Sequence, residues 1–256
     1  LAVLAPAWSE ALLSRMPEVD ESIEMPLGHG QIELGVRWRL ARQLKQKNFD
    51  QAIVLPGSLK SALIPFFAGI ATRTGFVGEQ RYGLLNDIRK LDKAGLPLNV
   101  ERFLVLGSPA HSLPDEIPKP ELLLDPAAQS AVREKFSLDA ERPLLALCPG
   151  AEFGPAKQWP ARHYAAVARA RLAQDWQVVL LGSAADAEVC AEINAASEDA
   201  CIDLSGKTSL TEVIDLLSLC DAVVSNDSGL MHIAAALERP LVAIYGSSSP
   251  DFTPPL

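Results

Sequence analysis

Short apolar runs alternate with longer segments of helical periodicity, most regularly in the second half of the chain. Apolar runs predict strands at Leu144–Cys148, Gln177–Leu181, Cys201–Leu204, Ala222–Ser225 and Leu241–Tyr245. Amphipathic segments predict helices over about 161–173, 185–196, 210–219 and 229–238, the third starting at a Ser209-x-x-Glu212 capping box. This alternation predicts an α/β fold with a doubly wound parallel sheet.

The first half shows the same alternation less clearly. Strands are predicted at Leu1–Ala5 and Ala52–Leu55, with a shorter one near Thr74–Val77. Apolar residues at helical spacing between the first two predict a helix that buries Ile32, Val36, Leu40 and Leu44. Its opposite face carries Arg39, Arg42 and Lys45, which we interpret as a solvated helix surface.

Residues 108–126 differ in character, because repeated prolines interrupt them and periodicity is weak. Proline breaks helices and favours extended chain, so we interpret this stretch as a crossing between domains. The predicted domains are 1–125 and 126–256. A helix at about 127–136 could belong to either side.

Polar clusters follow every predicted strand of the second half. They are residues 149–157, 182–186, 205–209, 226–232 and 246–249. The carboxyl ends of parallel strands meet at one edge of a sheet, and ligands of doubly wound folds bind there. We therefore expect the binding site along this edge.

The segment Ser225–His232 joins a predicted strand to an Ala-rich helix. Free N–H groups and the helix dipole at such a turn favour an anion, while Asp227 and His232 could bind hydroxyl groups. An ordinary capped helix is the alternative. Lys157, at the end of a flexible loop, could meet a phosphate or be a surface lysine. Asp186 could bind a sugar hydroxyl or only pair with a helix dipole, and Thr208 could only extend a cap.

Composition narrows the function classes. The 256 residues are 48% hydrophobic and carry a formal net charge of −9. The sequence contains no cluster of basic residues of the kind that binds nucleic acid. No apolar run approaches the ~20 residues of a membrane span. Four scattered cysteines lack metal-ligand spacing, and nothing suggests zinc. Dinucleotide, Walker and nucleophile-elbow motifs are absent. No signal peptide is visible, which indicates a cytoplasmic protein.

The predicted α/β pattern is interrupted at both ends of the chain. The chain starts in a predicted strand at Leu1 and stops in a loop after another strand, before a covering helix. We therefore expect the sequence to be part of a longer enzyme.

Several motifs together resemble glycosyltransferase family 9, the ADP-heptose:lipopolysaccharide heptosyltransferases. They are Lys157-x-Trp159-Pro160, Gly182-Ser183, Leu204–Leu210 and above all Ser225–Leu237. The segment Tyr245–Pro255 resembles the subtype that transfers heptose onto a heptose of the inner core, and Leu4–Trp8, Met16–Val19 and Pro26–Gly30 agree. The resemblance covers essentially the whole chain.

This resemblance implies a GT-B fold of two Rossmann-like domains and an inverting transfer that needs no metal or other cofactor. The donor would be ADP-L-glycero-D-manno-heptose, and the acceptor would be the lipopolysaccharide inner core at the inner membrane surface. By motif position Lys157 would face the donor phosphates and stabilise the leaving group. Asp227, Ser228, Gly229 and His232 would line the sugar and phosphate site, with Asp186 and Thr208 near the adenosine.

The same resemblance leaves two positions unassigned. Glu152 and Phe153 occupy a loop where a related subtype carries threonines, so no contact is predicted for them. The family's general base lies on a loop after a strand expected upstream of Leu1.

Other interpretations stay open. Another GT-B nucleotide-sugar enzyme, such as a 2-epimerase, would share the donor site, and a nucleotide-binding module would lack catalysis. A periplasmic binding protein is disfavoured because no signal peptide is seen. Lys60, after the Ala52–Leu55 strand, is predicted to face an anionic acceptor.

Overall fold

The computed structural model describes residues 1–28, 30–108, 112–151 and 155–256. Contacts divide the chain into two compact units. The large unit contains Leu1–Ile23, Lys119–Pro250 and Pro254–Leu256, and the small unit contains Glu24–Pro118 and Asp251–Thr253. The chain therefore starts in the large unit, forms the small unit and returns to the large unit at Lys119. The prediction placed the boundary at residue 125 and assigned residues 1–23 to the first domain, whereas contacts group them with the large unit.

The large unit is built around five parallel strands in the order β10-β9-β6-β7-β8. These are β6 (Leu144–Cys148), β7 (Gln177–Leu180), β8 (Ile202–Asp203), β9 (Ala222–Asn226) and β10 (Leu241–Ile244). All five predicted strands are confirmed, with ends within one residue of those expected. The strand order reverses between β6 and β9, which places the switch point of a doubly wound sheet there.

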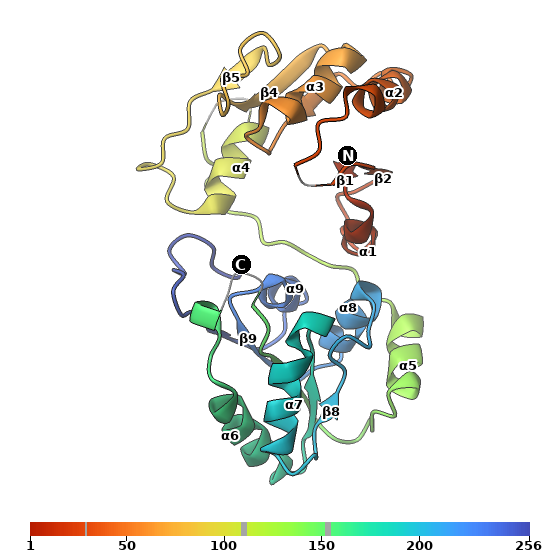
Figure 1. The fold of residues 1–256 in the computed structure, drawn as a ribbon, viewed down its shortest axis with the longest axis vertical. Helices are drawn as coiled ribbons and strands as arrows, with labels where there is room; N and C mark the ends of the chain where they lie inside the picture. The colour runs from red at the N-terminus through yellow and green to blue at the C-terminus, as the bar shows by residue number, and fades with distance from the viewer. Residues whose placement is uncertain (29, 109–111, 152–154) are drawn as a thin grey trace. The chain divides into compact units, whose positions relative to one another are not determined.

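Helices cover both faces of this sheet (Figure 1). They are α5 (Pro126–Lys135), α6 (Ala161–Leu172), α7 (Ala187–Ala195), α8 (Leu210–Ser218) and α9 (Gly229–Ala236). Leu145 and Leu147 of β6 point into a core with α6 and α7, whereas Leu144 and Ala146 point into a core with α8 and α9. This alternation of one strand between two cores confirms the predicted layers.

The predicted capping box is present at the start of α8. Ser209 Oγ accepts the Glu212 N–H at 3.3 Å, and the Glu212 carboxylate accepts the Ser209 N–H at 2.9 Å. Two backbone donors of the first turn are thereby satisfied, which fixes where the helix begins.

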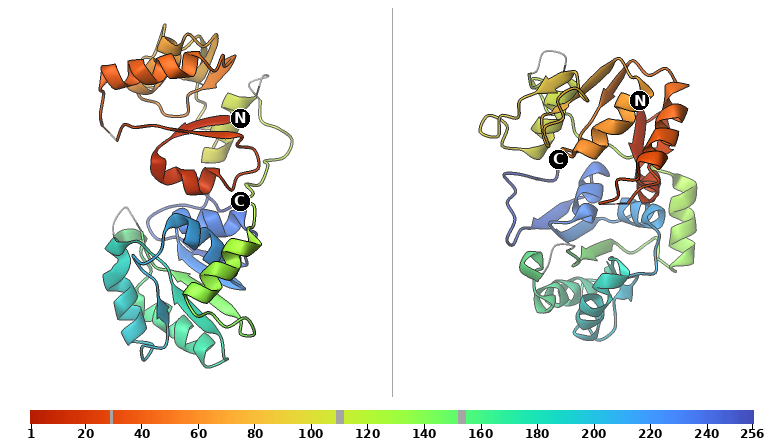
Figure 2. Two further views of the ribbon diagram at one scale, coloured as in Figure 1. Left: turned by 90° about the vertical axis from the view of Figure 1, so that its right-hand side faces the viewer. Right: turned by 45° about the horizontal axis from the view of Figure 1, so that its top comes forward.

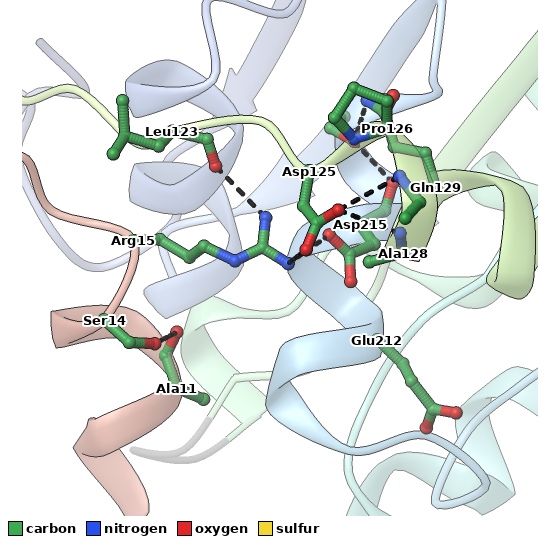
Figure 3. Close-up of polar contacts among 12 residues, drawn as sticks. Ala11, Ser14, Arg15, Leu123, Asp125, Pro126, Ala128, Gln129, Glu212 and Asp215 are labelled. Atoms are coloured by element: carbon green, nitrogen blue, oxygen red, sulfur yellow. Dashed lines mark hydrogen bonds and ion pairs between the residues drawn. The ribbon is translucent and has the colours of Figure 1, made fainter.

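The N-terminal segment of the large unit holds β1 (Ala2–Ala5), a 3₁₀ turn (Ala7–Ser9), α1 (Glu10–Leu13) and most of β2 (Glu21–Glu24), with β1 paired to β2. Leu12 and Met16 pack against the core beneath α8. Arg15 donates to the Asp215 carboxylate of α8 at 2.7 Å and to the Leu123 carbonyl at 3.1 Å (Figure 3). In return the Leu123 N–H donates to the Arg15 carbonyl. These contacts attach the segment to α8 and to the residues before α5.

The small unit has three parallel strands, β3 (Gln51–Ile53), β4 (Thr72–Phe76) and β5 (Asp87–Arg89). Its helices are α2 (Leu34–Lys45), α3 (Leu59–Ala68) and α4 (Asn99–Gly107). The predictions missed α1, β2, α3, β5 and α4. Pro65 inside α3, after the Gly57-Ser58 turn, and the polar sequences of β2 and β5 obscured the periodicity.

The α2 prediction needs one correction. Ile32 precedes the helix and is 59% exposed, so it is not part of the buried face. The buried positions are Arg37, Leu40, Ala41 and Leu44. Arg37 is tolerated inside because its guanidinium donates to the carbonyls of Gln31, Ile32 and Lys60.

Candidate functional site

The carboxyl ends of the large-unit strands bring Lys157 and Asp227 together. Lys157 ends a 3₁₀ turn, Pro155–Lys157, between β6 and α6, and Asp227 follows β9 directly. Lys157 Nζ donates to Asp227 Oδ2 at 2.7 Å. The aspartate is 8% exposed and the lysine 23% exposed. A cation and an anion therefore meet at the switch point, with the cation the more accessible partner.

Asp227 is ionised at this position. Burial alone would raise its pKa, but the hydrogen bond from Lys157, the nearby hydroxyl of Ser248 and the charges of Lys157 and His232 hold the pKa below the usual range. Burial lowers the pKa of His232, and the negative charge of Asp227 raises it by a smaller amount. At neutral pH the site thus combines one anion, one cation and a neutral imidazole.

Asn226 fixes the loops that carry these side chains. It is fully buried, and its Nδ2 donates to the Pro149 carbonyl at 2.6 Å. Its Oδ1 accepts both the Tyr164 hydroxyl, at 2.9 Å, and the Trp159 N–H, at 3.1 Å. One carboxamide therefore ties β9 to the loop after β6 and to α6.

The start of α9 lies next to this pair. Ser228 is the N-cap residue and makes no capping bond with its side chain, and Gly229 begins the helix. The Ser228 hydroxyl instead lies 3.2 Å from that of Ser225. No acidic residue occupies the first turn. The N-terminal amides of α9 are left without a side-chain cap, as a helix start that receives an anion requires.

Asp186 lies beyond the end of β7, where it closes a turn. Its Oδ2 accepts the Ser183 N–H at 2.8 Å and the Ser183 hydroxyl at 2.7 Å. A Cβ added to Gly150 or Gly182 would come within 2.6 Å or 2.8 Å of Asp186 atoms. Both glycines are therefore needed for the close approach of this carboxylate to the backbone. In the structure Asp186 acts as a capping residue of the strand-end loops.

The other predicted residues occupy different surroundings. Thr208 is half-buried in the loop before α8, at the same sheet edge. Lys60 is the second residue of α3 in the small unit, where its backbone carbonyl accepts from Arg37. Glu152 and Phe153 lie outside the described residues.

The loop after β10 also reaches this site. A Cβ on Gly246 would come within 2.5 Å of the Ala156 carbonyl, and the Ser247 N–H donates to that carbonyl. The sequence analysis placed residues 246–249 at this edge but gave Ser248 no role. Asn226 and Tyr164 were also missed as site-building residues. Among the described residues no group of three or more His, Cys, Asp or Glu is placed to hold a metal ion.

Comparison with known proteins agrees with this geometry. Residues 37–256 match glycosyltransferase family 9 (heptosyltransferase). The chain belongs to this family. Lipopolysaccharide heptosyltransferase 2 of Escherichia coli (strain K12) is 53% identical over 264 residues, covering 99% of this chain and 76% of that protein. Lipooligosaccharide heptosyltransferase 2 of Haemophilus influenzae (strain ATCC 51907 / DSM 11121 / KW20 / Rd) is 52% identical with the same coverage.

Solved structures of this family share the fold. E. coli ADP-heptose lps heptosyltransferase II superposes with a TM-score of 0.91 at 51% identity, over 100% of this chain and 78% of that chain. The E. coli heptosyltransferase WaaC with ADP matches with a TM-score of 0.65 at 22% identity, over 98% and 79%. The predicted α/β fold of GT-B type is confirmed. Among the described residues no helix is long and apolar enough to cross a membrane.

Proposed function

We propose that this glycosyltransferase moves L-glycero-D-manno-heptose from ADP-heptose to the heptose of a lipopolysaccharide inner core, with inversion at the anomeric carbon. Support comes from its similarity, above 50% identity, to proteins named heptosyltransferase 2 or II. The observation that carries the proposal is the Lys157–Asp227 pair beside the uncapped start of α9.

In this proposal the diphosphate of the donor occupies the switch point. The acceptor oxygen attacks the anomeric carbon, the bond from that carbon to the phosphate oxygen breaks, and ADP leaves with the electron pair. Lys157 and the amides of Ser228 and Gly229 face the negative charge that grows on the departing phosphate. The proton of the acceptor hydroxyl passes to a base that we assign to no residue of this chain.

Each remaining residue has a defined task. Asp227, ionised and bound to Lys157, orients the ammonium and accepts a sugar hydroxyl, while His232 contacts the sugar or phosphate. Asp186 and Thr208 lie near the adenosine. Lys60 faces the acidic acceptor from the small unit. The acceptor is lipid-linked, so we propose that the enzyme works in the cytoplasm at the inner face of the inner membrane.

The test is a transfer assay with the full-length protein. ADP-heptose and a heptose-bearing core oligosaccharide should give the extended oligosaccharide and one ADP per transfer. The same oligosaccharide without its heptose is the control acceptor and should stay unmodified. Equal transfer to both acceptors would remove the assignment of the acceptor sugar.

Two other classes are tested in the same experiment. A GT-B epimerase would change the configuration of a UDP-sugar without needing an acceptor, so UDP-N-acetylglucosamine is included as an alternative substrate. A nucleotide-binding module would bind ADP, measured by calorimetry, but release none from ADP-heptose. Either result replaces the proposal.

A further inference from the structure

One face of the small unit exposes large apolar side chains that a water-soluble surface rarely groups. On α2, Leu34 is 56% exposed and Trp38 is 50% exposed. On α3, Leu59 is 43% exposed and Phe66 is 40% exposed. Single exposed apolar residues are ordinary, but several on two neighbouring helices indicate an interaction surface.

Trp38 and Phe66, the two aromatic residues of this group, are joined into one surface through Phe67. The helices α2 and α3 lie side by side, as the orange ribbons in Figure 2 show. The Trp38 ring meets the Phe67 ring edge-on, with centroids 5.4 Å apart, and Phe67 meets Phe66 at 5.7 Å. An apolar strip therefore runs from α2 across the helix boundary to α3. We call it, with its flanking cations, the α2–α3 face.

The charge of this segment is opposite to that of the chain. Residues 34–73 contain seven Lys or Arg and one acidic residue, Asp50, within a chain of net charge −9. Arg37 is buried on backbone carbonyls and does not contribute to the surface. The exposed cations are Arg39, Arg42, Lys45 and Lys47 of α2 and the turn after it. Glu33 and Asp50 lie at the two ends of this cationic stretch.

We propose that the α2–α3 face docks on an anionic lipid bilayer. A helix with Trp and Leu beside Arg and Lys is suited to the boundary between headgroups and acyl chains. The apolar strip would enter the boundary while the cations bind lipid phosphates. The complementary charge favours an anionic membrane over an uncharged one. The surface is chemically independent of the donor site, so the inference does not depend on heptosyl transfer.

The experiment is co-sedimentation of the full chain with vesicles that contain no lipopolysaccharide. One set contains phosphatidylcholine with phosphatidylglycerol, and the other contains phosphatidylcholine alone. The wild-type chain should bind the anionic vesicles and release them as salt is raised. The double variant Arg39→Gln/Arg42→Gln should bind about 30-fold more weakly, since each surface cation contributes ~1 kcal/mol near an anionic leaflet.

The matched control is Lys119→Gln/Arg162→Gln, which removes two exposed cations of the large unit that also make no hydrogen bond or ion pair with the described residues. It should bind like the wild type. Thermal unfolding of each variant verifies that the fold is retained, and Arg39 and Arg42 make no hydrogen bond or ion pair within the described residues. Equal weakening by both pairs would show a non-specific charge effect and overturn the proposal.

Tryptophan fluorescence locates the contact. A blue shift on vesicle binding should disappear in Trp38→Phe while sedimentation persists, because phenylalanine keeps the surface apolar. A shift that persists would place another tryptophan, such as the 73% exposed Trp8, in the lipid and would overturn the assignment. Concentration-dependent dimerisation abolished by Arg39→Gln/Arg42→Gln, without vesicle binding, would instead identify the face as a contact with a second copy.

Discussion

Two aspartates of the large unit form ion pairs at the same distance, yet their pKa values shift in opposite directions. Asp227 binds Lys157 at 2.7 Å, and Asp215 binds Arg15 at 2.7 Å. The pKa of Asp227 lies below the ordinary value of 3.8, whereas that of Asp215 lies above it. The length of a salt bridge therefore does not decide whether the site favours the charge.

The surroundings explain the difference. Burial raises the pKa of both carboxyls. At Asp227, the effects of Lys157, Ser248 and His232 together lower the pKa by more than burial raises it. Asp215 has Arg15 as its cation but also faces the negative charges of Asp125 and Glu212 (Figure 3), and it is 2% exposed. Burial dominates there.

The two pairs consequently suit different tasks. Lys157 is the more exposed partner of its pair and can exchange contacts with an incoming anion. Arg15 is 12% exposed and is also bound to the Leu123 carbonyl, so it holds chain segments together. We infer that the pair at the strand ends is a ligand-binding pair and that the pair on α8 is structural.

The strongest test of this distinction is Lys157→Ala in the full-length protein. We expect kcat to fall about 10²–10³-fold, because one positioned donor to a growing negative charge is lost. The Kd for ADP should rise less, since charge on the leaving oxygen is smaller in the ground state. Steady-state kinetics and ADP calorimetry measure the two effects.

Arg162→Ala, which removes an exposed cation from α6, is the control and should leave kcat unchanged. A normal kcat with strongly weakened ADP binding in Lys157→Ala would show that Lys157 only anchors the ground state. No change in either quantity would remove Lys157 from the site.

Arg15→Ala should instead reduce stability. Asp215 would become a buried carboxylate without its guanidinium, and we expect the free energy of unfolding to fall by about 3 kcal/mol at neutral pH. The loss should shrink as pH falls toward 3.8, because Asp215 takes up a proton more readily in the folded variant. Denaturant unfolding across this pH range measures it. A loss that is independent of pH would mean that packing of Arg15, not its charge, is responsible.

Gly150→Ala should have a smaller effect, confined to the strand-end loops. The new methyl would lie 2.6 Å from the Asp186 carboxyl carbon, so the loop must shift, and we expect a loss of about 1–3 kcal/mol. Gly35→Ala in α2 is the control, since its Cβ would meet no atom within 4 Å. That variant should be neutral or slightly stabilising. Equal behaviour of both variants in thermal unfolding would contradict the close approach of Asp186.

Asp227→Asn should give the smallest change in stability, about 1 kcal/mol at neutral pH, the size of one net hydrogen bond. The folded pKa of Asp227 is depressed, so its contribution is present above pH 3.8 and disappears as pH falls below that value. The gap between wild type and variant should therefore close below 3.8, whereas that of Arg15→Ala closes above it. If the difference in unfolding free energy closed above pH 3.8 for both Arg15→Ala and Asp227→Asn, the distinction between the two ion pairs would be wrong.

The pattern of the second half predicted its strands well because their sequences are mostly apolar, and β6 and β7 are buried on both faces. Leu144–Cys148 is a continuous apolar run, and every residue of β6 is buried. Strands β2 and β5 have the sequences ESIE and DIR, whose polar residues give no comparable signal. Pairing with neighbouring strands, which a local pattern does not contain, decides their conformation.

The sequence located the candidate site but not its internal contacts. Polar clusters after the strands placed Lys157 and Asp227 at one edge, because parallel strands end together. The approach of Asp186 to Gly150 depends on the packing of loops. The Arg15–Asp215 pair joins residues 200 positions apart, and no periodicity reports such a contact.

The buried carboxamide of Asn226 has a consequence for how fast a ligand can be accepted. Its three hydrogen bonds hold Pro149, Trp159 and the beginning of α6 in place before any ligand arrives. The conformational entropy of these backbone segments is lost during folding and not again on binding. An incoming anion would therefore meet these segments already ordered, and its association would not wait for them to order.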